Sequence, residues 1–241
     1  VYVIADSQGK TKEVVVSEWL KNLEGSSTIE DATNLTDIKN VKGDESYKNS
    51  GSGIVWESNG SDIYYQGKSN EELPVSVKVT YYLDGKQISP DDLLGKSGKV
   101  KIRYDYTNNS STSVKIDNEN SEVYTPFVMM TGMILPNETF SNVTIDNGKI
   151  ISDGNKNIVI GFGMPGLKDS LNLSSEESDK VTIPESLSIE ADVKDFTMSS
   201  TYTVALSDLL DDMNMDDIAD VDDLQTALDD LEDAALQLSL I

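Results

Sequence analysis

The sequence predicts a mainly β protein: an antiparallel Ig-like sandwich with an additional N-terminal β region and a C-terminal acidic helix. Apolar and polar residues alternate strictly over Val75–Leu83 and again over Lys99–Tyr106. A period of two buries one face of a strand and leaves the other in water, which is typical of antiparallel sheets. Turn-forming pairs such as Asp84-Gly85 separate short apolar runs, and no long helical pattern precedes residue 207. Short strands at this spacing favour a sandwich or an open barrel.

The first region, residues 1–70, is predicted to be a small β region that holds two hairpins. One hairpin turns at Asp6–Gly9 and the other at Asn59-Gly60. Asn-Gly between two apolar runs is a strong short-range hairpin signal. The stretch between them, Lys21–Ser52, is polar and has few periodic signals. The strands that flank the two turns are expected at Tyr2–Ala5, Glu13–Ser17, Ile54–Glu57 and Asp62–Gln66.

The second region, residues 71–206, is predicted to be the sandwich. Between its two alternating strands, Ser89–Leu94 has the form of one short helical turn, with Ser89 as cap and Pro90 at the first position. Leu167–Lys180 is polar and is expected to be a loop. Further strands are expected at Glu122–Leu135, Phe140–Ile145, Lys149–Ser152, Asn157–Met164, Ser186–Val193 and Thr197–Leu206.

The third region, residues 207–241, is predicted to be an acidic helix. It contains 12 acidic side chains and neither Lys nor Arg. Its apolar residues recur at alternate spacings of three and four, which is the register of a coiled coil. The helix either docks on its own β domain or begins a longer coiled-coil stalk, and we expect the chain to be part of a longer protein. The apolar seam consists of Val221, Leu224, Leu228, Leu231, Ala235 and Leu238.

The composition excludes several classes of function. The formal net charge is −24, from 43 acidic and 19 basic residues. Such a surface repels phosphate backbones and anionic headgroups, so we expect no nucleic-acid binding. No apolar run approaches the roughly 18 to 20 residues that span a bilayer. A signal peptide or a membrane anchor would therefore lie outside this sequence.

The residue types available argue against an enzyme. The chain has neither Cys nor His, which removes thiolate nucleophiles, imidazole bases and the ligands of most zinc sites. Ser7 and Lys10 match the Ser-x-x-Lys pattern of penicillin-binding enzymes, but they lie in a predicted hairpin turn, not on a helix. Paired carboxylates carry no signal in a chain with this many acids. We expect a non-catalytic protein with no cofactor, Ca²⁺ excepted.

A calcium site is one candidate, at the start of the acidic helix. Five oxygen-bearing residues lie at offsets 1, 3, 5, 9 and 12, where EF-hand loops place their ligands. The pattern departs from that loop because Asp217 takes the place of its Gly and offset 12 is Asp instead of Glu. The alternative is a solvated helix start, where Asp is favoured by the dipole. The candidate ligands are Asp212, Asn214, Asp216, Asp220 and Asp223.

Aromatic residues in the β regions are the second candidate site. Flat rings on a β-sandwich grip sugar rings through burial and contact with their faces. In Tyr64-Tyr65, a period of two sends one ring to each face of the sheet, so one is expected to be exposed. The alternative is that Trp56 and one Tyr of each pair fill the core. The candidate ligand-binding residues are Trp19, Trp56, Tyr64 and Tyr65, and Tyr82 and Tyr124 lie in similar surroundings.

Four phrases of the sequence resemble a family of surface proteins. They are Val1–Lys10 (VYVIADSQGK), Glu18–Asn22 (EWLKN), Pro74–Lys86 (PVSVKVTYYLDGK) and Gly98–Asn108 (GKVKIRYDYTN). The chain is similar in these phrases to large exported or membrane-anchored proteins of Gram-positive gut bacteria, of the phage-infection-protein type. In those proteins a β-rich outer region leads into helical heptad segments and membrane spans. The family has no established activity, so the resemblance implies a location and no site residues.

We therefore expect a non-catalytic extracellular module that acts in binding or spacing at the cell envelope. Its partner would be a protein or a glycan of the envelope. Its place would be the cell surface, with the full-length protein anchored in the cell membrane through segments outside this sequence. The alternative function is a carbohydrate-binding domain that uses exposed aromatic residues.

Overall fold

The chain folds into two β units, which we describe separately. In the computed structural model, the first unit is Val1–Glu72 and the second is Leu73–Ile241. This boundary lies two residues after the one predicted from the sequence, which followed residue 70. The structure describes residues 1–51, 53–116, 119–171, 176, 180–198, 200–207, 226 and 230.

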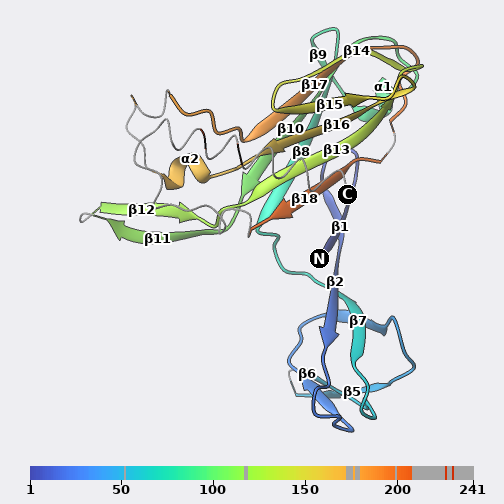
Figure 1. Ribbon diagram of the computed structural model, residues 1–241, viewed down its shortest axis with the longest axis vertical. Helices are drawn as coiled ribbons and strands as arrows, with labels where there is room; N and C mark the ends of the chain where they lie inside the picture. The colour runs from blue at the N-terminus through green and yellow to red at the C-terminus, as the bar shows by residue number, and fades with distance from the viewer. Residues whose placement is uncertain are drawn as a thin grey trace. The chain divides into compact units, whose positions relative to one another are not determined.

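Unit 1 consists of two small antiparallel sheets. The larger has the strand order β1-β2-β7-β4 and the smaller β3-β6-β5. Figure 1 shows the unit, coloured from blue to turquoise, with β2 and β7 side by side. The strands are β1 (Tyr2–Ala5), β2 (Thr11–Leu20), β3 (Ile29–Asp31), β4 (Thr36–Asn40), β5 (Tyr47–Ser50), β6 (Gly53–Trp56) and β7 (Ile63–Lys68).

Side chains from both sheets form the core of unit 1. Ile54 and Trp56 come from β6, and Ile63 and Tyr65 come from β7. The Trp56 ring lies 5.4 Å from the Tyr65 ring and 5.0 Å from the Tyr47 ring, between centroids. A cluster of large aromatic faces gives this 72-residue unit an apolar core of its own.

The predicted hairpin of β6 and β7 is wrong, although its turn forms. Asn59 and Gly60 have φ angles of 48° and 88°, as the Asn-Gly pair predicts. However, β6 pairs with β3 and β5, whereas β7 pairs with β2 and β4. The amides of Asn59 and Gly60 donate to the carbonyls of Ser27 and Ser26 at 3.0 Å each. These bonds attach the turn to the loop after β2. The strands on either side of the turn consequently belong to different sheets.

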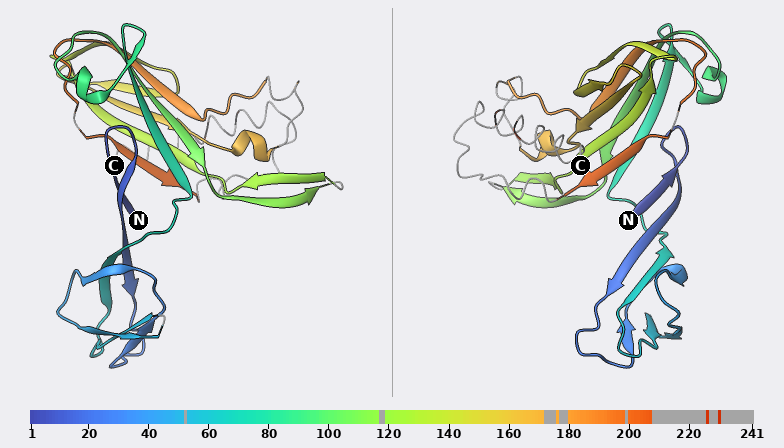
Figure 2. Two further views of the ribbon diagram at one scale, coloured as in Figure 1. Left: turned by 180° about the vertical axis from the view of Figure 1, so that it is seen from behind. Right: turned by 45° about the vertical axis from the view of Figure 1, so that its right-hand side comes forward.

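Unit 2 contains two larger antiparallel sheets and a separate hairpin (Figures 1 and 2). The sheets have the orders β14-β17-β10-β8-β9 and β15-β16-β13-β18, and the hairpin is β11-β12. The elements are β8 (Val75–Leu83), β9 (Lys86–Ile88), α1 (Pro90–Leu93), β10 (Gly98–Asn108), β11 (Ser111–Ile116), β12 (Glu119–Tyr124), β13 (Val128–Pro136), β14 (Phe140–Ile145), β15 (Gly148–Ser152), β16 (Lys156–Gly163), α2 (Leu167–Ser170), β17 (Ser186–Val193) and β18 (Tyr202–Leu206).

The two sheets of unit 2 share one core, which makes the unit sandwich-like. The alternation predicted for β10 is confirmed, because Val100, Ile102 and Tyr104 are buried while the residues between them are partly exposed. These side chains pack in one cluster with Met129 and Leu135 of β13, from the other sheet. A mainly β fold built from antiparallel pairs is therefore confirmed for the described residues.

The cap of α1 was predicted correctly, whereas two longer elements of unit 2 were not. The hydroxyl of Ser89 accepts the amide of Asp92 at 3.2 Å and caps α1 as expected. The single strand expected over Glu122–Leu135 is instead β12 and β13, with three residues between them that include Pro126. Proline has no amide to donate and restricts the residue before it, so the ladder breaks there. The expected loop Leu167–Lys180 begins with α2.

The acidic helix predicted for residues 207–241 lies outside the described residues, apart from Ser207, Thr226 and Asp230. Its apolar seam falls entirely within the part that is not described. Within the described part of the chain, no helix has the length and apolar character needed to cross a membrane.

The core of unit 1 predicts a large effect of Trp56→Ala. Trp56 is 0% exposed, and removing a buried Trp side chain costs about 3–5 kcal/mol. We expect this loss in the free energy of unfolding of unit 1, measured by urea titration with Trp19 as the remaining fluorophore. The matched control is Trp19→Ala, followed through Trp56, with an expected loss of about 1–2 kcal/mol. Equal losses in the two variants would contradict the assignment of Trp56 to the core.

Buried tyrosines predict that alkali destabilises the protein. Burial raises the pKa of Tyr104 to about 12, and it also raises the pKa of Tyr65 and Tyr106. The unfolded chain loses these protons near pH 10, whereas the folded chain keeps them. Stability is therefore unaffected below about pH 10 and falls as the pH rises above it.

In a urea titration of unit 2 between pH 10 and pH 12, Tyr104→Phe should reduce this fall by about 1 kcal/mol per pH unit. Tyr202→Phe is the matched control, because Tyr202 is 73% exposed. It should leave the pH dependence of the wild type unchanged. A pH dependence that Tyr104→Phe does not alter would show that Tyr104 ionises normally.

Candidate functional site

The four aromatic candidates divide into two buried and two surface residues. Trp56 and Tyr65 are 0% and 1% exposed and belong to the core of unit 1. Neither presents a ring to a ligand, so their ligand-binding assignment is corrected. Trp19 is 51% exposed and Tyr64 is half-buried. The pleat of β7 causes this division, because Tyr64 and Tyr65 are neighbours and must face opposite sides of the sheet.

Trp19 and Tyr64 form a stacked pair on the outer face of the larger sheet. They are directly opposite each other in the register of β2 and β7. Their ring centroids are 5.4 Å apart and their planes differ by 13°. Cross-strand aromatic pairs stabilise a sheet by contact, and here each ring also limits the rotamers of the other. The result is an ordered pair of rings whose facing sides cover each other and whose remaining surface, chiefly that of Trp19, is open to solvent.

Two lysines complete this surface. The Lys21 ammonium lies 4.3 Å from the centroid of the Trp19 ring, and the Lys42 ammonium lies 4.0 Å from that of Tyr64. Both distances are within the range of cation–π attraction. Lys21 follows Trp19 at the end of β2, whereas Lys42 reaches Tyr64 from the β4 side, where Val41 donates its amide to the Tyr64 carbonyl at 2.8 Å. We call Trp19, Tyr64, Lys21 and Lys42 the aromatic surface.

Asp62 fixes the orientation of the indole. One carboxylate oxygen accepts the Trp19 Nε1 proton at 2.9 Å, and the other accepts the Asn22 amide at 2.8 Å. These two hydrogen bonds, the Asn22 bond first, lower the pKa of Asp62 below its ordinary value, and the charges of Lys21 and Lys42 act in the same direction. The carboxylate therefore stays ionised and restrains the ring that a ligand would touch.

Asn22 ties the loop after β2 to the turn before β7. Its side-chain amide donates to the Ser26 carbonyl at 2.8 Å and its carbonyl accepts the Ser26 amide at 2.8 Å. The same amide lies 3.3 Å from the Ser58 hydroxyl and from the Ser61 carbonyl. The hydrogen bonds of Asn22 therefore join two loops that are far apart in sequence, and Asp62 is bound to the same network.

Sequence reasoning found the rings but missed their partners. The contact of Lys21 could have been predicted, because Lys21 lies two residues after Trp19 and therefore on the same side of an extended chain. Asp62 and Lys42 gave no signal. Asp62 is 43 residues from Trp19, and Lys42 lies in the polar stretch for which no strand was predicted.

The other aromatic candidates lie in unit 2. Tyr82 and Tyr124 are both half-buried, on β8 and β12. Tyr82 lines a concave area of the outer sheet face together with Lys99, Lys101 and Glu190. The lysines there are paired with Glu190 at 3.3 and 3.6 Å. Exposed pairs of this kind contribute little to stability. They do, however, provide both lysines with an acidic partner.

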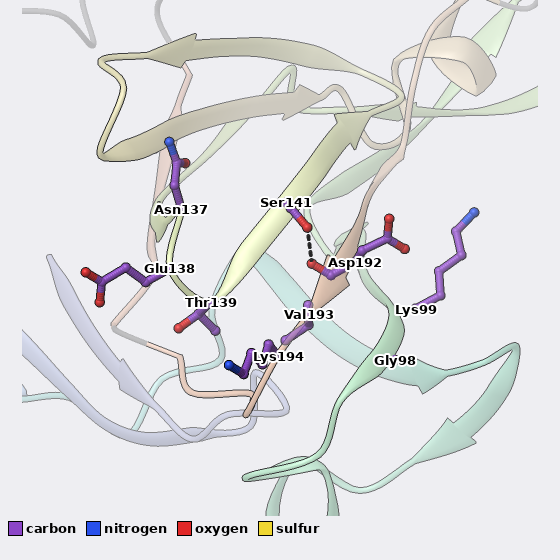
Figure 3. Close-up of a pocket in the computed structure, with 9 residues that line it drawn as sticks. All are labelled: Gly98, Lys99, Asn137, Glu138, Thr139, Ser141, Asp192, Val193 and Lys194. Atoms are coloured by element: carbon purple, nitrogen blue, oxygen red, sulfur yellow. Dashed lines mark hydrogen bonds between the residues drawn. The ribbon is translucent and has the colours of Figure 1, made fainter.

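A hollow of about 420 Å³ lies at one edge of unit 2 (Figure 3). It is formed where the turn after β13 meets β14, the end of β17 and the start of β10. The Ser141 hydroxyl donates to the Asp192 carbonyl at 3.2 Å, and the Lys194 amide donates to the Thr139 carbonyl at 2.9 Å. Most of its lining residues are polar or charged and none is aromatic, so we assign it no ligand. The lining residues are Gly98, Lys99, Asn137, Glu138, Thr139, Ser141, Asp192, Val193 and Lys194.

The calcium candidates lie outside the described residues. This applies to all five positions, Asp212, Asn214, Asp216, Asp220 and Asp223. Within the described residues, no group of three or more acidic side chains is placed to hold a metal ion.

Comparisons with known proteins leave the function to be inferred from these residues. No protein-family model matches the chain. A search of curated proteins finds no match either.

The Asp62 contact predicts an acid transition at Trp19. Because the pKa of Asp62 is lowered in the folded state, its contribution is present above about pH 4 and is lost as the pH falls through the lowered pKa. We expect the indole N–H resonance of Trp19 to shift in that range in ¹H–¹⁵N spectra. Asp62→Asn keeps an accepting oxygen but removes the titration, so its Trp19 resonance should stay constant. The same shift in wild type and Asp62→Asn would contradict this origin.

Proposed function

We propose that the protein is a non-catalytic binding module of the cell surface that holds a carbohydrate ligand on the aromatic surface. The observation that carries the proposal is the exposure of Trp19. A large ring that is 51% exposed leaves apolar area uncovered, and yet it is stacked on Tyr64 and hydrogen-bonded to Asp62. This combination suits recognition, because a fixed ring loses little entropy when a ligand covers it.

The magnitude is sufficient for a weak, specific contact. Aromatic side chains bury about 150–250 Å², so the open half of Trp19 offers roughly 100 Å². At about 25 cal/mol per Å², covering it contributes on the order of 2–3 kcal/mol. The apolar face of a sugar ring matches a flat indole, whereas its hydroxyls find partners in neighbouring polar groups. Trp is also prominent in protein interfaces, which makes an envelope protein the second candidate ligand.

The proposed location is extracellular, with the full-length protein anchored in the cell membrane through segments outside this sequence. The resemblance to exported surface proteins of Gram-positive gut bacteria supports it. In this arrangement residues 207–241 would begin a coiled-coil stalk that spaces the binding module from its anchor.

For unit 2 we propose an Ig-like arrangement. Its larger sheet places β8, β10, β17 and β14 in the order that A, B, E and D have in Ig domains. In the smaller sheet β13 and β18 pair as C and F do, and β16 flanks β13 as C′ flanks C. The strand in the D position, β14, precedes the hairpin of β15 and β16, whereas D follows the C′ strands in variable-type domains. The central pairings therefore support an Ig-like fold with a rearranged edge.

The proposal predicts a glycan-array signal that depends on Trp19. Trp19→Ala should abolish binding and Trp19→Phe should retain part of it, because Phe keeps a flat ring but loses the bond to Asp62. Tyr82→Ala is the control, since Tyr82 lies on the other unit. An array without saccharide binding, or binding that depends on Tyr82 and not on Trp19, would contradict the proposal.

A further inference from the structure

We infer that the ligand of the aromatic surface is an anionic saccharide, one that carries carboxylate or phosphate groups. The inference rests on the proposed function and names the ligand class of the same site. It follows from the two ammonium groups that the fold places on the two rings, at 4.3 and 4.0 Å from their centroids. A neutral sugar needs the rings alone.

The two lysines keep their charges available. Three other lysines of unit 1 form ion pairs with acids: Lys12 with Asp6 at 3.0 Å, Lys68 with Glu13 at 3.1 Å, and Lys48 with Glu57. Among the ion pairs of the described residues, none includes Lys21 or Lys42. Both side chains are exposed. In a chain with 43 acids, these two lysines are distinguished by their shared position on one pair of aromatic rings.

The acid that contacts Trp19 forms no ion pair with them. Asp62 is the acid whose pKa responds to both lysines, but each of its oxygens already accepts a hydrogen bond, from Trp19 and from Asn22. Asp62 is therefore held by hydrogen bonds within unit 1 and forms no ion pair with either lysine. At physiological ionic strength charges are screened beyond about 8 Å, so acids farther away than this weaken the attraction of a bound anion only slightly.

The geometry suits a ligand that stacks on the aromatic rings and forms an ion pair with a lysine at the same time. Trp19 is on β2, Tyr64 on the neighbouring β7, and Lys42 enters from the β4 side. With about 4.8 Å between strands, the surface extends on the order of 10 Å across the sheet. A saccharide that lies on the rings would bring an exocyclic carboxylate or phosphate to an ammonium at either end.

The competing explanation is that the lysines only stabilise the ring pair. Cation–π contacts at exposed sites are weakly favourable without any ligand. The two explanations differ in what the charge does for binding. A structural role makes no distinction between a charged saccharide and its neutral counterpart, whereas ligand recognition does.

The test compares matched ligands by calorimetry. Trigalacturonic acid and its methyl ester differ in charge but share their rings, and mannose 6-phosphate and mannose form the second pair. The wild type should bind the charged member of at least one pair about tenfold more tightly than the neutral one. The pair that shows the difference identifies carboxylate or phosphate as the preferred anion.

Two double variants assign the difference to charge. Lys21→Met with Lys42→Met keeps the aliphatic cover of the rings and should reduce the preference to within about twofold. Lys21→Arg with Lys42→Arg keeps the charges and should retain it. Thermal unfolding of each variant checks that the fold is intact.

The outcomes separate the inference from the function on which it rests. Equal binding of charged and neutral members, or binding of neutral saccharides alone in this test and on the array, overturns the anionic ligand and leaves carbohydrate binding standing. A preference that survives in the methionine variant also overturns it. Absence of binding to all four probes and to all array saccharides overturns the proposed function together with the inference.

Discussion

The pleat of β7 is the constraint on which the aromatic surface and the core of unit 1 both depend. Adjacent residues of a strand face opposite sides of its sheet. Tyr65 therefore packs on Trp56 in the core, and Tyr64 stacks on Trp19 outside. A shift of one residue in the register of β7 would exchange these roles and expose the core ring. Stability and the proposed recognition are in this way linked through one strand.

Asp62 connects that strand to the loops around it. It precedes β7 directly and receives hydrogen bonds from Trp19 and Asn22, while Asn22 is bound to Ser26. The exposed indole is consequently oriented by a network that involves no ligand. Preorganisation of this kind reduces the entropy lost on binding. Unit 2, by contrast, has the larger core, and lysines of one of its sheet faces are paired with Glu190.

Part of the fold could be predicted from the sequence, because strong periodicity is a local property. The alternation in β8 and β10 and the Ser89 cap are each visible within a few residues. Strand partners are not local: the turn at Asn59 formed, but hydrogen bonds to Ser26 and Ser27 sent its strands to different sheets. The site shows the same limit. The period of two separated Tyr64 from Tyr65, but it gave no means of telling which face is the core. The strands β3, β4 and β5 were missed because their polar, half-exposed residues lack a periodic signal.

The most direct measurement follows the two indole N–H resonances during titration with a saccharide. The chain has only two tryptophans, one on the aromatic surface and one in the core, so each resonance reports one side of β7. With trigalacturonic acid, or with mannose 6-phosphate if phosphate is the preferred anion, the Trp19 resonance should shift and saturate while that of Trp56 stays in place. Two stationary resonances, or a shift confined to Trp56, would contradict the account.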